Sequence, residues 1–101
     1  MGGQAAPASA AIWRLADGVL WKAWDEELVA FCERTGSTHR FIDIAAWLVE
    51  QIAVQPSTQD ELLGVASREL ELPDGVDLDE SLQASLTRLK ALSILEQTPL
   101  H

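Results

Sequence analysis

The side chains best suited to chemistry in this chain of 101 residues are scattered, not grouped. His39 could serve as a base or a metal ligand, but no second His or Cys stands at metal-binding spacing from it. Cys32 lies in an apolar stretch, where a thiol usually packs as a small hydrophobic residue. Asp25, Glu26 and Glu27 resemble paired carboxylates, yet adjacent residues of a hairpin point to opposite sides, which favours a solvated turn.

Other signatures of catalysis are missing from the sequence. It has no glycine-rich phosphate loop and no nucleophile placed beside a base in a recognisable pattern. We therefore predict no catalytic residues, no metal site, no cofactor and no enzymatic activity. The four Trp residues could stack a ligand, but we expect Trp47 and at least one of Trp21 and Trp24 to pack in the core.

Composition narrows the classes of partner and the compartment. The net charge is −9, which argues against nucleic acid because phosphate binding needs clustered Lys and Arg. Half of the 16 acids lie between Asp60 and Glu80, where we expect a solvated helix face, or alternatively a surface that attracts a basic partner. A single cysteine and the lack of a signal peptide or an apolar run of about 18 residues predict a cytoplasmic protein that does not span a membrane.

The first half of the chain has the pattern of a small sheet. Residues 19–24, 28–33 and 38–42 are rich in apolar and β-branched side chains, and short turns at 25–26 and 34–37 separate them. Such an order predicts a three-stranded antiparallel meander. Residues 12–15 and 93–96 form short extended pieces, and residues 1–11 form a flexible tail before a domain at 12–97.

The second half has the period of helices. We expect a helix at 44–53 capped by Asp43, a second capped by Ser57 or Thr58, and a third capped by Asp77 or Asp79. The second helix should end by 72–75, where Leu-Pro-Asp-Gly breaks the pattern, and the third carries a leucine stripe. The fold class is therefore α+β, a winged helix-turn-helix-like arrangement of three strands followed by three helices.

The order of these features resembles the PqqD-like family of peptide chaperones, which are recognition elements for ribosomally synthesised and post-translationally modified peptides (RiPPs). It is most similar to the branch of the HPr-rel-A system, found beside an HPr-kinase-related protein. The likeness rests on ordered pattern and covers residues 12–97, nearly the whole folded part. Its residues are Trp-Arg-Leu-Ala-Asp-Gly-Val-Leu-Trp at 13–21, residues 29–31, Gly-Ser-Thr-His-Arg-Phe-Ile-Asp at 36–43, Ala-Ala-Trp-Leu-Val at 45–49 and Leu-Lys-Ala-Leu-Ser-Ile-Leu-Glu at 89–96.

The resemblance implies a peptide chaperone that binds the leader of a precursor peptide and presents it to a modifying enzyme, for which the HPr-kinase-related protein is a candidate. The leader would add as a strand to the edge of the third strand and pack against the third helix. The peptide-binding residues implied in this chain are Thr38, His39, Arg40, Phe41, Ile42, Ser81, Ser85, Arg88, Leu89 and Leu92.

Two other functions remain open at this point. A winged-helix architecture often binds DNA, but the third helix would present Asp79 and Glu80 to the major groove, which disfavours a regulator of this kind. The open strand edge or exposed Trp residues could instead make the chain a structural subunit of an enzyme complex or a homodimer.

Overall fold

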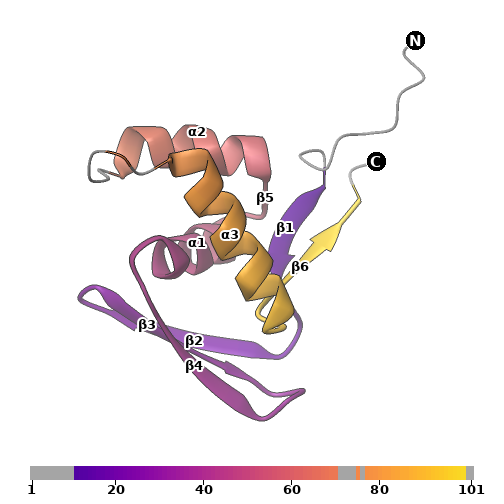
Figure 1. Ribbon diagram of the computed structural model, residues 1–101. Helices are drawn as coiled ribbons and strands as arrows, with labels where there is room; N and C mark the ends of the chain where they lie inside the picture. Colours follow the sequence, from indigo (N-terminus) through magenta and orange to yellow (C-terminus); the bar gives the residue numbers. More distant parts are fainter. Residues whose placement is uncertain (1–10, 71–74, 76, 100–101) are drawn as a thin grey trace.

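The structure is a computed structural model that describes residues 11–70, 75 and 77–99, and a three-stranded antiparallel meander lies at the bottom of it in Figure 1. The meander consists of β2 (Val19–Trp24), β3 (Glu27–Cys32) and β4 (Ser37–Ile42), in that spatial order. Three helices follow in sequence, so the predicted α+β fold is confirmed and the strand ends move by one residue at most.

Two tight turns set the register of the meander. Asp25 has a positive φ of 52° in the turn between β2 and β3, and Gly36 has a φ of 73° before β4, as its residue type predicts. Trp24 lies opposite Glu27, and Cys32 lies opposite Ser37, so both hairpins close without a bulge.

The helices are α1 (Asp43–Val54), α2 (Gln59–Glu69) and α3 (Leu78–Ala91). The predicted caps of the last two are correct. Thr58 and Glu61 form a reciprocal capping box at α2, and Asp77 accepts a hydrogen bond from the backbone N–H of Glu80 at α3. The prediction for α1 is wrong, because Asp43 is its first residue and Ile42 occupies the N-cap position without a side-chain hydrogen bond.

A second sheet joins the two ends of the described chain. Strand β1 (Ile12–Leu15) lies between β5 (Ser57–Thr58) and β6 (Leu95–Thr98), and both pairings are antiparallel. The sequence indicated residues 12–15 and 93–96 only as isolated extended pieces, which correspond to β1 and, shifted by two residues, to β6. Their pairing, from Ile12 opposite Thr98 to Leu15 opposite Leu95, brings the end of α3 back beside the start of the fold.

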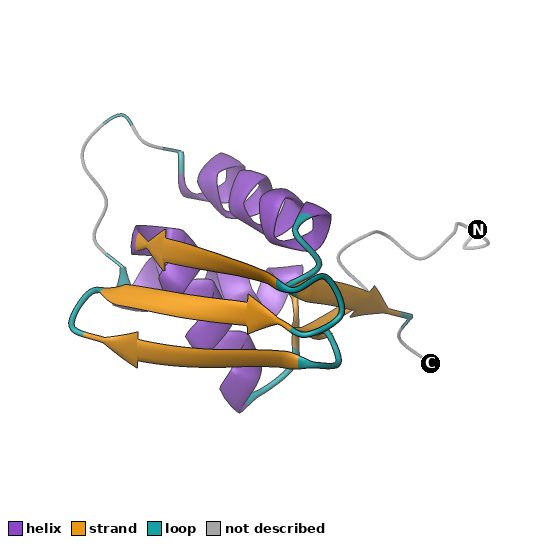
Figure 2. Ribbon diagram, turned by 90° about the horizontal axis from the view of Figure 1, so that it is seen from below, coloured by secondary structure: helices purple, strands orange, loops and turns teal. Residues whose placement is uncertain are grey.

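The core fills the space between the meander and the helices. Leu28, Leu48, Leu82 and Leu86 are fully buried, and the expected stripe of α3 thus faces inward. Cys32 is also fully buried and packs as a small hydrophobic residue, as predicted. Figure 2 shows the face of the meander that is turned away from the helices, and no described helix covers this face.

The Trp residues divide differently from expectation. Trp47 packs against the core, as predicted, but Trp21 and Trp24 are 37% and 45% exposed. The fully enclosed indole is that of Trp13 in β1.

Among the described residues, no helix has the length and apolarity needed to cross a membrane. The predicted tail lies outside the described residues except for Ala11, as do residues 72–74 of the predicted helix end at 72–75.

The capping box generates a stability prediction. Replacing Thr58 by Ala should lower the free energy of unfolding by about 1 kcal/mol, because the N–H of Glu61 loses its acceptor at the start of α2. Urea unfolding followed by circular dichroism measures the change. Thr87→Ala, on an exposed face of α3, is the matched control and should change the free energy by less than about 0.5 kcal/mol. Equal effects of the two substitutions would mean that the box does not stabilise α2.

Candidate peptide-binding site

Strand β4 is an edge strand. In the described part of the chain it pairs with β3 on one side and with no strand on the other. An unpaired edge presents backbone N–H and C=O groups that another extended segment can satisfy. Which residues of β4 can pair with such a segment depends on which of them turn these groups outward.

The alternation of hydrogen bonds across the meander determines the direction of the backbone groups of β4. The N–H of Glu33 donates to the C=O of Gly18 at 3.0 Å, which marks this opposite pair as hydrogen-bonded. In an antiparallel pair hydrogen-bonded and non-hydrogen-bonded positions alternate, so β3 turns the backbone of residues 28, 30 and 32 toward β4.

Their partners on β4 are Phe41, His39 and Ser37. The backbone groups of these three residues are therefore used by β3. Those of Thr38, Arg40 and Ile42 point to the open edge. Three of the five predicted strand residues thus offer backbone groups to a ligand, and the other two, His39 and Phe41, face the ligand only with their side chains.

The side chains of β4 divide between the two faces of the sheet. Phe41 points toward the helices and is only 2% exposed, and the half-buried ring of His39 stacks on it with a centroid separation of 6.1 Å. Arg88 of α3 places its guanidinium 5.9 Å from the centroid of the Phe41 ring, a cation–π contact that connects α3 to the edge strand. Figure 2 shows α3 lying along the side of the meander beside β4.

The predicted residues of α3 differ in accessibility. Ser81 and Ser85 are half-buried and Arg88 is exposed, so all three can meet a ligand. Leu92 is half-buried and packs against the core. Leu89 is fully enclosed, so it supports the site from beneath and has no surface to offer a peptide in this conformation.

The other face of the meander holds an apolar patch that the sequence interpretation missed. Its exposed members, which we call the outer patch, are Leu20, Trp24, Phe31 and Ile42. Arg40 lies on the same face and forms an ion pair with Glu27 at 3.2 Å. The signal in the sequence was the alternation itself: once β3 is fixed with Leu28 inward, every second residue of β2 and β4 must face outward.

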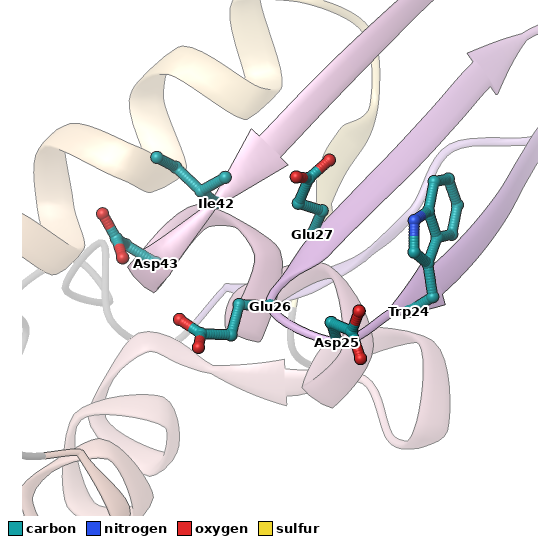
Figure 3. A pocket seen from close by; sticks show the side chains of 6 residues that line it. All are labelled: Trp24, Asp25, Glu26, Glu27, Ile42 and Asp43. Carbon is teal, nitrogen blue, oxygen red and sulfur yellow. The ribbon is translucent and has the colours of Figure 1, made fainter.

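A shallow hollow lies at one end of this patch, where the turn between β2 and β3 meets the start of α1 (Figure 3). Four carboxylates and two apolar side chains line it: Trp24, Asp25, Glu26, Glu27, Ile42 and Asp43. Asp25 and Glu26 form an exposed turn, as predicted, whereas Glu27 is the half-buried first residue of β3 and is paired with Arg40. In the described ranges, no group of three or more His, Cys, Asp or Glu residues is arranged to hold a metal ion.

Comparison with known proteins gives a likeness of fold. No protein-family model matches the chain, and no curated protein sequence matches it. Two solved structures do. "TbiB1 in complex with the TbiA(beta) leader peptide" has a TM-score of 0.69 and 19% identity, over 82% of this chain and 94% of that one. "Lasso peptide synthetase B1 complexed with the leader peptide" has a TM-score of 0.65 and 20% identity, over 83% of this chain and 96% of that one. At such identities the likeness establishes the fold alone.

Phe41 and Ile42 are neighbours in β4 but differ in burial, so they should differ in their contribution to the free energy of unfolding. Phe41→Ala should lower the free energy of unfolding by about 3–5 kcal/mol, because it empties a buried site between the edge strand and the helices. Ile42→Ala, one residue further along and 53% exposed, should cost less than about 1 kcal/mol. Urea unfolding of both variants tests this, and a mild effect of Phe41→Ala would show that Phe41 does not anchor β4.

Proposed function

We propose that this protein is a non-catalytic recognition module that binds the leader of a ribosomally synthesised precursor peptide and presents it to a modifying enzyme. Two facts support the proposal together. The fold matches two proteins solved as complexes with leader peptides, and the edge of β4 in this chain is open. The open edge beside α3 is the observation that carries the proposal, since it is observed in this chain itself and is not transferred from the solved structures.

The leader would bind by strand addition. Its backbone would pair with Thr38, Arg40 and Ile42, whose N–H and C=O groups point to the open edge. Its inward side chains would lie among His39, Phe41 and the stripe of α3 formed by the half-buried Ser81 and Ser85 and the exposed Arg88, with Leu89 and Leu92 supporting that stripe. The two serines would leave room for the peptide because their side chains are small.

Backbone pairing alone would not hold such a peptide. Three residues with one donor and one acceptor each allow roughly six hydrogen bonds, worth about 0.5–1.5 kcal/mol apiece. Association costs about 4–15 kcal/mol, so these bonds at best offset it. Side-chain contacts must therefore supply both the remaining affinity and the choice of peptide.

The modifying enzyme would need a second surface, and the outer patch is available for it. Leu20, Trp24 and Ile42 are large, apolar and 45–57% exposed, as expected at a protein contact. This observation keeps the related alternative, a subunit of an enzyme complex, consistent with the same chain. The PqqD-like assignment, the HPr-rel-A branch and an HPr-kinase-related partner remain predictions from the sequence.

A proline at the edge tests strand addition. Arg40→Pro removes an N–H that points outward and leaves the hydrogen bonds to β3 in place, so it should abolish binding of peptides selected on the wild-type protein from a random display library. Arg40→Ala, which loses the ion pair with Glu27 but keeps the N–H, should bind within about threefold of wild type. Fluorescence anisotropy with labelled selected peptides measures both affinities.

A proline on the opposite edge is the second control. Ala23→Pro removes an N–H that points away from β3 on β2, so it should leave binding unchanged. Circular dichroism must show that all three variants fold. Loss of binding in Ala23→Pro but not in Arg40→Pro would place the peptide on β2, and binding that survives both prolines would rule out strand addition.

A further inference from the structure

We infer that Arg88 selects an acidic residue of the bound peptide, at the one peptide position that lies opposite Phe41. The inference rests on the proposed function and deepens it, because it states which chemistry the site reads. It follows from the hydrogen-bond alternation of β4, the place of Arg88 above Phe41, and the absence of competing charges on the same stripe of α3.

The alternation fixes where the side chain of that peptide position must go. In this proposal the peptide adds antiparallel to β4. The backbone of Phe41 bonds to β3, so a peptide residue opposite Phe41 on the free side then occupies a non-hydrogen-bonded position. Its side chain lies on the same face of the sheet as the Phe41 ring, with Cβ atoms about 4.5–5.5 Å apart. That face is the one toward the helices, where α3 stands.

Arg88 is the charged group that such a side chain would meet. Its guanidinium lies 5.9 Å from the centroid of the Phe41 ring. Ser81 and Ser85 precede it on the same stripe of α3, so this stripe carries no carboxylate to neutralise it. Arg14 and Arg40 each contact a carboxylate, whereas in the described part of the chain no carboxylate lies within salt-bridge distance of Arg88.

A carboxylate is the group that satisfies this arrangement. The planar guanidinium presents paired donors that match carboxylate geometry, and the Phe41 ring beneath it holds the group in place. A basic residue at the same position would be repelled. The preference should be local, because the chain as a whole has a net charge of −9 and would repel acids elsewhere on the peptide.

A random peptide library tests the inference, because selection from it does not require the sequence of the leader. We expect peptides enriched on the full-length wild-type protein to carry Asp or Glu at a single fixed position, with no enrichment of acids at the others. Selection on Arg88→Glu should remove that preference or reverse it to Lys and Arg. Arg68→Glu, an exposed arginine on α2 with the same change of charge, is the matched control and should leave the preference intact.

Affinities of one selected peptide complete the test. Arg88→Glu should weaken its binding roughly five- to tenfold, and exchanging the acid of the peptide for Lys should restore binding to that variant while weakening binding to wild type. Arg88→Lys, which keeps the charge but loses the planar fork, should retain the acidic preference with a smaller loss.

The outcomes separate the two claims. Peptides whose binding is lost in Arg40→Pro but which show no acidic position, or bind Arg88→Glu and Arg68→Glu alike, would overturn the role of Arg88 and leave strand addition standing. Peptides that bind Arg40→Pro as well as wild type, or a selection that enriches nothing, would overturn the proposed function and the inference with it.

Discussion

The hydrogen bonds between β3 and β4 decide how every residue of the candidate site faces. They use the backbone of Ser37, His39 and Phe41, and they leave that of Thr38, Arg40 and Ile42 on the open edge. The side chains alternate in step, so the residues with outward backbone groups point away from the helices. A slip of one residue would exchange both sets at once and would bury Arg40 in place of Phe41.

The rest of the fold keeps that register. Phe41 is buried although it lies on an edge strand, and α1 begins directly after Ile42, so β4 is held by packing at its end and by the Gly36 turn at its start. The leucines of α3 are buried, and the half-buried Ser81 and Ser85 lie on the flank of the helix next to them. Burial of one face of α3 therefore fixes the direction of the other, and with it the place of Arg88 above Phe41.

The sequence predicted the parts of this fold that are specified locally. Alternating segments with short turns gave the meander, and the polar caps at Thr58 and Asp77 gave two helix starts. Strands β1 and β6 come from opposite ends of the described chain, and no tight turn connects them. Their pairing over four residues therefore leaves no local signal in the sequence. Trp21 and Trp24 were expected partly in the core because of their residue type. Their exposure depends on the register, and type alone cannot supply that.

The same constraint relates the two surfaces to which functions are proposed. A strand added to β4 would carry alternate side chains to opposite faces of the enlarged sheet. Those opposite His39 and Phe41 would meet α3 and Arg88, whereas those opposite Thr38, Arg40 and Ile42 would extend the outer patch of Leu20, Trp24, Phe31 and Ile42. Successive residues of a single leader would thus serve different tasks: one set would be read by this protein, and the other would become part of the surface that a second protein meets. The proposed function needs such a division, because a module that acts by presentation alone must leave part of the peptide exposed beside a surface of its own.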